Sequence, residues 1–226
     1  IEIGRPPGRE WYGWRPDDEA AAPGAPEDGG TSHLCVVDGD GLAVACTETI
    51  NLHFGSLVSS DRLGFCLNNE MDDFTTRSGE ANAFGLKQSD RNRPAPGKRP
   101  LSSMSPTIVL DADGDVRAVA GGSGGPRIIT ATTQGLLNAL VRGDDAARAV
   151  ERGRIHHQWS PNVLEVEPGF AERHQGMGVD IWMRKVHHQV ATAKPAETAC
   201  VQLIVREKDG WHAASDPRKG GRPAGE

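Results

Sequence analysis

The segment between Thr31 and Ile50 contains two strand-forming runs joined by a tight turn. It reads TSHLCVVDGDGLAVACTETI, in which apolar and β-branched residues flank Asp38-Gly39-Asp40-Gly41. Asp-Gly pairs between such runs are a strong short-range signal for a β-hairpin, because glycine adopts the backbone conformation that these turns require. The folded part of the chain is therefore expected to begin with a hairpin, with Thr31 at the start of its first strand.

A second hairpin is predicted in PTIVLDADGDVRAVAGG, where 108–110 would face 116–119 across the turn from Asp111 to Asp115. The alternating aspartates resemble a calcium loop. An EF-hand loop starting at Asp111 would need a bidentate glutamate at its twelfth position, but Gly122 stands there. A hairpin turn is therefore the preferred interpretation.

Two helices are predicted after the glycine cluster, over 128–142 and 144–153, followed by strands in NVLEVE and ACVQLIVRE. The first helix would place on one face Ile129, Leu136, Leu137, Leu140 and Val141. Paired strands and helices without regular alternation favour an α+β fold with antiparallel sheets.

Residues 1–30 differ in composition from the rest, with five prolines, scattered glycines and an acidic cluster. Such a segment cannot bury enough apolar surface to offset the entropy lost on ordering. We therefore expect a flexible tail or linker over residues 1–30 and one catalytic domain over residues 31–226.

Charge and motifs exclude several functional classes. A net charge of −6 provides no basic face for phosphates, so no nucleic-acid partner is expected. Neither GxGxxG nor GxxxxGK[ST] is present, and no cofactor is predicted. The histidine pairs 156–157 and 187–188 lack the companion ligands of a zinc site, so no metal is assigned. The four cysteines have no CxxC spacing, which favours buried free thiols.

Thr31 follows Gly29-Gly30 and is a candidate nucleophile. A threonine hydroxyl needs an adjacent base, and its own α-amine could serve if the Gly30–Thr31 bond were cut. Glycine before the threonine suits such a cut, because it tolerates strained geometry and leaves its carbonyl accessible. From spacing alone, a simple turn leading into a strand remains the alternative.

Several runs together carry a resemblance to a known family. These are TSHLCVVDGDGLAVACTETIN, FGS, LNNEMDDF, PGKRPLSSMSPTIV, GGSGGPRIIT, HHQW and AASDPRKGGRPAG. In order and spacing they resemble the small subunit of the gamma-glutamyltransferases (gamma-glutamyltranspeptidases), which belong to the N-terminal nucleophile hydrolases. The likeness implies a four-layer αββα sandwich completed by a large subunit of the same precursor, and a zymogen that cleaves itself at Gly30–Thr31.

The resemblance also implies an activity. Thr31 would form a γ-glutamyl ester with glutathione or another γ-glutamyl compound, and an amino acid, a dipeptide or water would accept the γ-glutamyl group. Thr49 would hydrogen-bond Thr31, and Gly124 and Gly125 would form the oxyanion hole. Family habit suggests a periplasmic, secreted or cell-surface location.

The same resemblance assigns the substrate-binding residues. Glu70 and Asp73, with Asn51, would hold the α-ammonium of the substrate, and Ser102 and Ser103 would bind its α-carboxylate. Strand alternation predicts that Asn51 shares a face with Thr49. Phe84 stands where some bacterial relatives place a lid tyrosine, so a hydroxyl contact from that position is not expected.

Two alternatives remain open at this point. One is a related acylase of the same superfamily, similar to cephalosporin acylases and acting on a glutaryl amide. It would have no use for groups that bind an α-amino acid head. The other is an unprocessed, catalytically silent partner chain, since residues 1–30 still precede Thr31.

Overall fold

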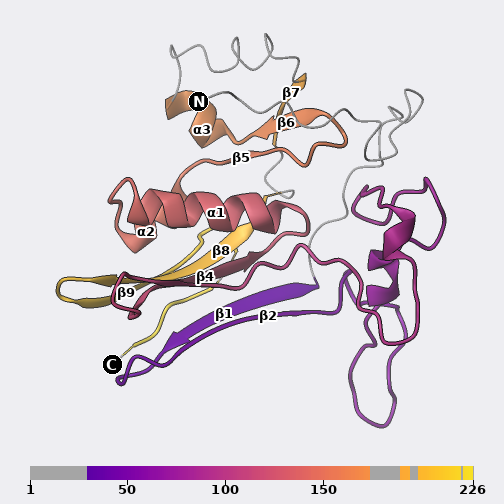
Figure 1. The fold of residues 1–226 in the computed structure, drawn as a ribbon, viewed down its shortest axis with the longest axis horizontal. Coiled ribbons are helices and arrows are strands. Elements are labelled where there is room, and N and C mark those ends of the chain that lie inside the picture. The colour runs from indigo at the N-terminus through magenta and orange to yellow at the C-terminus, as the bar shows by residue number, and fades with distance from the viewer. Residues whose placement is uncertain (1–29, 174–188, 194–197, 220, 226) are drawn as a thin grey trace. The chain divides into compact units, whose positions relative to one another are not determined.

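The computed structural model describes residues 30–173, 189–193, 198–219 and 221–225, which form two compact units (Figure 1). The larger unit contains residues 30–69 and the described residues from 103 onward, and the smaller contains residues 70–102. All but the last residue of the predicted tail lie outside the described residues. The boundary at Thr31 therefore stays a prediction.

The larger unit is an α+β structure. Its elements are β1 (Thr31–Val37), β2 (Ala43–Thr49), β3 (Thr107–Leu110), β4 (Val116–Ser123), α1 (Arg127–Leu140), α2 (Ala146–Glu151), β5 (Ile155–His156), β6 (Val163–Val166), α3 (Pro168–Arg173), β7 (Gln189–Thr192), β8 (Cys200–Glu207) and β9 (Gly210–Ser215). One antiparallel sheet has the strand order β3-β4-β8-β9, β1 pairs with β2, and a further sheet has the order β5-β6-β7. The smaller unit has two short 3-10 helices, η3 (Glu70–Asp73) and η4 (Asp90–Asn92).

Both predicted hairpins are confirmed. β1 pairs with β2 in the register Thr31↔Thr49, and β3 pairs with β4 across the turn beginning at Asp111. In each turn the first aspartate closes the loop, because the Oδ1 atoms of Asp38 and Asp111 each accept two backbone N–H groups. An aspartate that bonds its own turn in this way needs no bound cation to explain its position.

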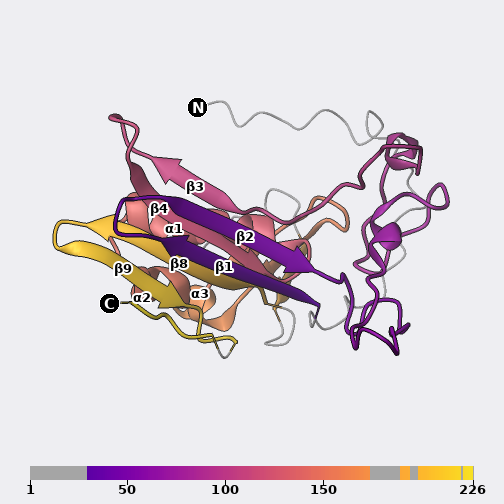
Figure 2. The same cartoon turned by 90° about the horizontal axis from the view of Figure 1, so that it is seen from below.

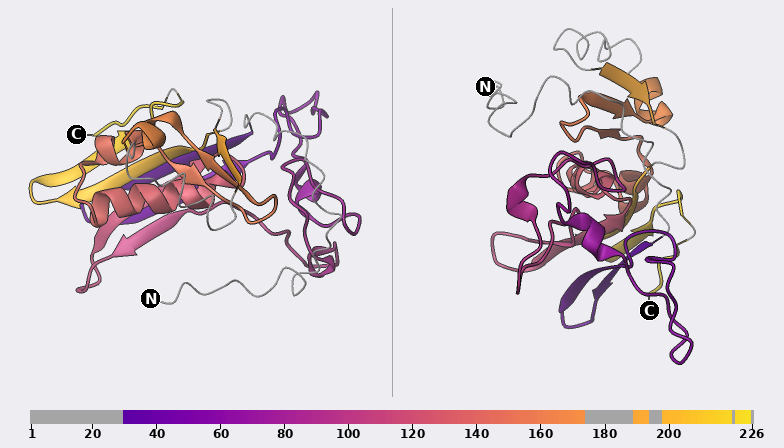
Figure 3. Two further views of the ribbon diagram at one scale, coloured as in Figure 1. Left: turned by 90° about the horizontal axis from the view of Figure 1, so that it is seen from above. Right: turned by 90° about the vertical axis from the view of Figure 1, so that its right-hand side faces the viewer.

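The larger unit is layered. Helices α1 and α2 cover one face of the sheet containing β4 and β8, and the β1-β2 hairpin lies on the opposite face (Figures 1 and 2). The right-hand view in Figure 3 shows the same order of layers in the larger unit, from α1 through the sheet to the β1-β2 hairpin. The core between helices and sheet is built mainly from small aliphatic side chains, including Ala118, Ala120, Ala149, Val150, Val201 and Leu203.

A glycine allows the two sheets to approach each other closely. A side chain at Gly121 of β4 would overlap the ring of His33, whose Cε1 lies 2.2 Å from the position that a Cβ would take. The ring contacts Thr47 Oγ1 through Nδ1 at 2.7 Å and Cys35 Sγ through Nε2 at 3.2 Å. Burial lowers the pKa of His33 to about 4, so this histidine is neutral at physiological pH.

The predicted apolar face of the first helix is only partly correct. The residues that α1 buries are mostly small. They are Ile128, Ala131, Thr132, Gly135 and Ala139. Leu136 and Leu140 pack against this core as predicted, whereas Ile129 and Leu137 are each 49% exposed and Val141 is 75% exposed. Small residues face the sheet because they let the helix axis approach it, which leaves larger side chains on the flank.

The cysteines are all free thiols, as predicted, but only Cys200 is fully buried. Cys35, Cys46 and Cys66 are partly exposed, so the expectation of burial is wrong for these three. Burial raises the pKa of Cys35 to about 12 and that of Cys200 to about 11. Among the described residues, no helix has the length and apolar character that crossing a bilayer requires.

Candidate active site

The hairpin register places the two predicted threonines side by side. Thr31 and Thr49 are directly paired, and their Oγ1 atoms lie 2.9 Å apart. The backbone N–H of Asn51 donates to Thr49 Oγ1 at 2.8 Å. The first residue of β1 is thus held against the last residue of β2 by a side-chain hydrogen bond.

Thr49 also reaches the peptide bond that precedes Thr31. Its hydroxyl donates to the carbonyl oxygen of Gly30 at 3.2 Å, and the Ile50 N–H donates to the same oxygen at 3.0 Å. A threonine hydroxyl carries a single proton. When Thr49 gives that proton to Gly30, the Thr31 hydroxyl must donate to Thr49. The proton chain therefore runs from Thr31 through Thr49 to the Gly30 oxygen.

Only glycine fits at position 30. A Cβ there would lie 2.6 Å from the carbonyl oxygens of both Asn51 and Leu52, and both obstacles are backbone atoms that cannot swing aside. The close approach of these segments brings the Gly30 carbonyl within reach of Thr49 and Ile50. Packing therefore requires glycine at position 30. This is a second reason for glycine, beside the conformational freedom noted from the sequence.

Asn51 lies in the same cluster, but strand alternation does not describe it. β2 ends at Thr49, and Asn51 has a φ of 73°, so the expectation that it shares a strand face with Thr49 is wrong. The residue is buried, its side chain donates to the Asn69 carbonyl at 3.3 Å, and Asn69 Oδ1 accepts the Leu52 N–H at 3.1 Å. Asn69 therefore fixes the turn that follows the second strand.

Gly124 and Gly125 form the loop between β4 and α1. Both have positive φ angles, of 137° and 55°, and a Cβ on Gly124 would lie 2.5 Å from the Cα of Ala199. These values explain the two glycines on backbone grounds. Just before them, Ser123 Oγ accepts a hydrogen bond of 2.6 Å from Lys219 Nζ, which ties the loop to the C-terminal segment.

The predicted carboxylate pair lies in the smaller unit, on the single turn of η3. Burial, the negative charge of Asp73 and a hydrogen bond with Asp73 together raise the pKa of Glu70 to about 7. Burial and the neighbouring Asp72 also raise the pKa of Asp73. Neighbouring carboxylates repel each other, so a bound cation would favour the ionised form of both. Asn82 donates to Asp73 Oδ1 at 3.4 Å.

The two predicted serines lie where the chain passes between the units. Ser102 belongs to the smaller unit and is exposed, and Ser103 belongs to the larger unit and is half-buried. The Ser103 carbonyl accepts a hydrogen bond of 3.0 Å from Ser105 Oγ. Their role as a carboxylate-binding pair stays a prediction.

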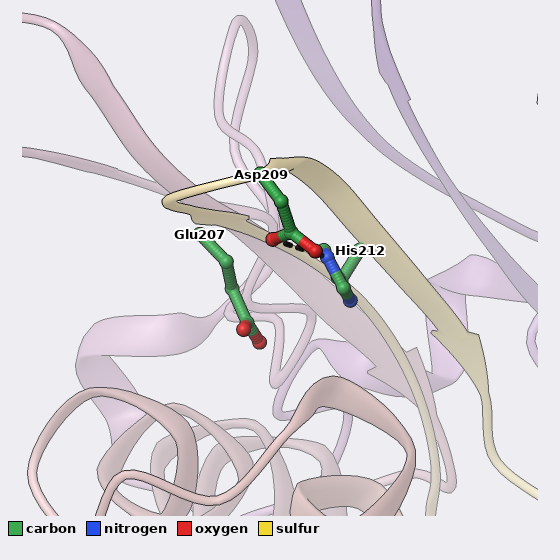
Figure 4. A group of neighbouring side chains, drawn as sticks. All are labelled: Glu207, Asp209 and His212. Atoms are coloured by element: carbon green, nitrogen blue, oxygen red, sulfur yellow. Dashed lines mark hydrogen bonds and ion pairs between the residues drawn. The ribbon is translucent and has the colours of Figure 1, made fainter.

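One group of side chains has the spacing of possible metal ligands. Glu207, Asp209 and His212 place one ligand atom each within 4.8 Å of one another on the β8–β9 hairpin (Figure 4). Asp209 Oδ1 and His212 Nε2 already bond each other at 3.0 Å, and Asp209 is largely exposed. Charged side chains at an exposed turn are usually solvated, so we assign no metal here. The pair 187–188 lies outside the described residues.

His156 contacts neighbouring side chains through both of its ring nitrogens. Its Nδ1 contacts Thr130 Oγ1 at 2.8 Å and its Nε2 contacts Gln158 Oε1 at 3.0 Å. Burial is the main cause that lowers its pKa, so a neutral ring is favoured. The histidine connects β5 to α1.

Three residues that hold the predicted site residues in place could not be found from the sequence. They are Ile50, Asn69 and Lys219. The Ile50 amide acts through its backbone, which leaves no sequence signal. Asn69 lies within the run LNNEMDDF, where its polar type was visible but its target was not. Lys219 is far from Ser123 in sequence, and only the fold brings the two together.

Stacked sheets covered by helices, with a threonine at the first position of the hairpin strand, define an N-terminal nucleophile hydrolase fold. The profile of the family described as Gamma-glutamyltranspeptidase matches residues 8–226. The chain belongs to the gamma-glutamyltranspeptidase family. The N-terminal nucleophile fold and the family that the sequence motifs predicted are thereby confirmed.

Individual relatives agree with this assignment. The chain is 42% identical over 190 residues to the glutathione hydrolase proenzyme of Arthroderma benhamiae, and 41% identical over 188 residues to that of Escherichia coli. These matches cover 84% and 83% of the chain but 31% of each relative. The chain thus spans about a third of the length of these curated relatives.

Solved structures show the same likeness. A mutant of the Helicobacter pylori gamma-glutamyltranspeptidase superimposes with a TM-score of 0.74 and 40% identity, covering 83% of this chain and 99% of that chain. The Pseudomonas nitroreducens gamma-glutamyltranspeptidase gives a TM-score of 0.73 at 38% identity, covering 86% and 97%. A cephalosporin acylase from Bacillus halodurans, at 20% identity and a TM-score of 0.65, shares the fold alone.

Proposed function

We propose that residues 31–226 are the catalytic part of a glutathione hydrolase and gamma-glutamyltransferase, released by self-cleavage of a longer precursor at Gly30–Thr31. The observation that carries the proposal is the hydrogen-bonded group formed by the Gly30 carbonyl, Thr31 and Thr49. The lengths of the matches support a longer precursor that is cut into separate chains. This chain covers about 31% of a proenzyme relative, but it covers 99% of one chain in the solved structure of another relative.

The first step would be attack of Thr31 Oγ1 on the carbonyl carbon of Gly30. Thr49 accepts the hydroxyl proton of Thr31 while its own proton moves toward the Gly30 oxygen, and the Ile50 N–H stabilises the same oxygen. As this intermediate collapses, the proton on the former Gly30 carbonyl oxygen passes to the Thr31 nitrogen and the C–N bond breaks, leaving an ester on Thr31 and a free α-amine. Water hydrolyses the ester to a Gly30 carboxylate and restores the hydroxyl.

In the mature enzyme the Thr31 amine replaces the peptide nitrogen and serves as the base. It takes the proton from Thr31 Oγ1 as the oxygen attacks the γ-carbonyl carbon of a γ-glutamyl amide. Gly124 and Gly125 would offer backbone N–H groups to the developing oxyanion. The departing amine takes the proton, and water or an acceptor amine releases the γ-glutamyl group from the ester.

Recognition of the glutamyl head group would use the polar residues that the family resemblance assigns. Glu70 and Asp73 supply carboxylates for the α-ammonium, with Asn51 assisting, because an ammonium group binds most strongly to ionised acceptors. Ser102 and Ser103 supply hydroxyls for the α-carboxylate. A large subunit of the same precursor would complete the site.

Replacing Thr49 with valine should slow both self-cleavage and turnover. Valine keeps the shape of the side chain but removes the hydroxyl that links Thr31 to the Gly30 oxygen. We expect kcat to fall roughly 10²-fold with a smaller change in KM, in the range of losing one positioned proton-transfer group. Thr49→Ser keeps the hydroxyl and should restore most of both rates. Equal rates for the valine variant and the parent would exclude this role of Thr49.

Binding of the glutamyl head group should depend on pH through Glu70. Below a pKa of about 7 this carboxyl carries a proton, and the ammonium of the ligand must displace it. The inhibition constant of glutamate, acting as a competitive product, should therefore rise on acidification by up to roughly tenfold for each unit below pH 7. Measuring this constant from about pH 5 to about pH 8 spans the transition.

Glu70→Gln provides the matched control for this pH dependence. The amide has a similar shape but does not titrate, so the inhibition constant should become much less dependent on pH over the same range. An unchanged pH profile in the glutamine variant would show that another group controls ligand binding.

A substrate comparison tests the proposed activity against the related acylase. The mature protein should release p-nitroaniline from γ-glutamyl-p-nitroanilide and act poorly on the glutaryl analogue, which lacks the α-ammonium that Glu70 and Asp73 would bind. The opposite preference would assign the chain to the acylases. Retention of residues 1–30 by intact mass, with no turnover of either substrate, would instead favour the silent partner chain.

A further inference from the structure

The smaller unit contains a buried asparagine. Asn92 lies in the short helix η4 and is 4% exposed, and Thr75 is buried to the same extent. Burying an amide is costly unless its donors and its acceptor find partners. The partners of Asn92 therefore show which parts of this unit are held together.

The side chain of Asn92 connects the beginning of the smaller unit to its end. Its Nδ2 donates to the backbone carbonyl of Asp73 at 2.7 Å and also to the side chain of Gln88. Its Oδ1 accepts the backbone N–H of Leu101 at 3.1 Å. An asparagine amide has two N–H donors and one carbonyl acceptor, so each of these groups has a partner.

The backbone of Asn92 strengthens this connection. The Thr75 N–H donates to the Asn92 carbonyl at 3.1 Å, and the Asn92 N–H donates to the Ser89 carbonyl at 3.0 Å. The hydroxyl of Thr75 donates to the same Ser89 carbonyl at 2.9 Å. The turn η4 is thus fixed to the segment that follows η3 through both its backbone and its side chain.

The two backbone groups that the Asn92 side chain holds lie at residues proposed to bind the substrate or next to them. Asp73 is one of the carboxylates proposed for the α-ammonium, and Glu70 bonds it. Leu101 directly precedes Ser102, which is proposed for the α-carboxylate. The ammonium and the carboxylate of a glutamyl group are attached to one carbon atom. Groups that bind both must therefore be kept at a fixed separation.

We infer that Asn92 is a positioning residue for the α-amino acid head group of the substrate. It holds the backbone of Asp73 and of the segment that leads into Ser102, and it thereby sets the spacing between the groups that bind the ammonium and the carboxylate. A ligand with both charged groups depends on this spacing, and a ligand without the ammonium does not. The inference rests on the proposed function, which supplies the roles of Asp73 and Ser102.

Calorimetric binding of glutamate and glutarate to the mature, large-subunit-bound protein tests this role. The two ligands have the same carbon chain and both carboxylates, but glutarate lacks the α-ammonium. Asn92→Asp keeps the shape of the side chain and an acceptor for the Leu101 N–H, but it loses the donors to Asp73 and Gln88. We expect the Kd of glutamate to rise roughly tenfold or more relative to that of glutarate. The added negative charge would by itself change this ratio in the opposite direction, because it attracts the ammonium.

Two further variants complete the comparison. Asn92→Ala removes every bond of the amide and should raise the Kd of glutamate at least as much, and if this variant does not fold, Asn92→Asp decides alone. Arg91→Ala changes an exposed side chain of the same turn and should bind both ligands like the parent.

Equal changes in the Kd of glutamate and glutarate, or no change in either, would overturn the inference, because a general loss of structure affects both ligands alike. Self-cleavage and γ-glutamyl release are measured on the same samples. A parent that shows neither reaction contradicts the proposed function, whereas an unaltered ratio of the two Kd values in the Asn92 variants of an active protein contradicts the inference alone. A parent that bound no glutamate would overturn both.

Discussion

Thr31→Ala is expected to leave the Gly30–Thr31 bond intact and to lower kcat for γ-glutamyl release by a factor on the order of 10⁴ or more, as for other essential nucleophiles. Alanine has no hydroxyl to attack the Gly30 carbonyl, so the α-amine that serves as the base is never released. The variant thus loses nucleophile and base through one change. Denaturing gel electrophoresis and the γ-glutamyl-p-nitroanilide assay measure the two losses.

Two control variants isolate the hydroxyl. Thr31→Ser keeps an oxygen at the same place and should retain self-cleavage, while Ser32→Ala changes an exposed neighbour whose side chain points to the opposite face of β1. Ser32→Ala should behave like the parent. Normal cleavage of the Thr31→Ala precursor would show that another group attacks this peptide bond.

Asp216→Ala is expected to cause the largest loss of stability. Asp216 is completely buried and bonds Arg154 at 2.6 Å, Arg218 at 2.9 Å and the Val201 N–H at 3.0 Å. Arg154 is itself 4% exposed and also donates to the Ala199 carbonyl. Removing the carboxylate leaves these donors buried without their acceptor. The expected cost is about 3–5 kcal/mol in the free energy of unfolding.

The exposed ion pair between Arg206 and Asp115 gives a matched control. Its atoms lie 3.3 Å apart, but the two side chains are 47% and 66% exposed. Asp115→Ala should therefore change the free energy of unfolding by only about 0–1 kcal/mol. Urea unfolding of the mature protein compares the two variants. Similar small losses for both would show that the buried network does not stabilise the fold.

The same network predicts a dependence of stability on acid. Burial opposes ionisation of Asp216, but Arg154 and Arg218 outweigh it and hold the pKa of this carboxyl below its ordinary value. A carboxyl with a depressed pKa in the folded state contributes stability above its unfolded pKa and loses it as pH falls through the folded pKa. Asp216→Ala should remove this contribution.

Local turn chemistry explains why the hairpins were predictable. Asp38 and Asp111 each close their own turn, so the residues that determine both hairpins lie within a few positions of one another. Once the first turn is fixed, β1 and β2 pair in one register, and that register places Thr31 opposite Thr49. The proposed nucleophile and its hydrogen-bonded neighbour could therefore be predicted together from a short stretch of sequence.

Features that depend on distant contacts were not predictable in the same way. Small residues form the face of α1 that packs on the sheet, so the spacing of large apolar residues misplaced Ile129, Leu137 and Val141. Asn51 follows the last residue of β2, and its position depends on Asn69. The raised pKa of Glu70 depends on burial and on Asp73 in the folded turn. No periodicity in the sequence reports these contacts.

The most direct test of the central claim is mass spectrometry of the mature protein trapped during turnover of a γ-glutamyl substrate. The account predicts a chain that begins at Thr31 with an unblocked α-amine, and a γ-glutamyl group in ester linkage to Thr31 that disappears when an acceptor amine is added. A γ-glutamyl adduct on any other residue, or full activity in a chain whose Gly30–Thr31 bond is uncut, would contradict it.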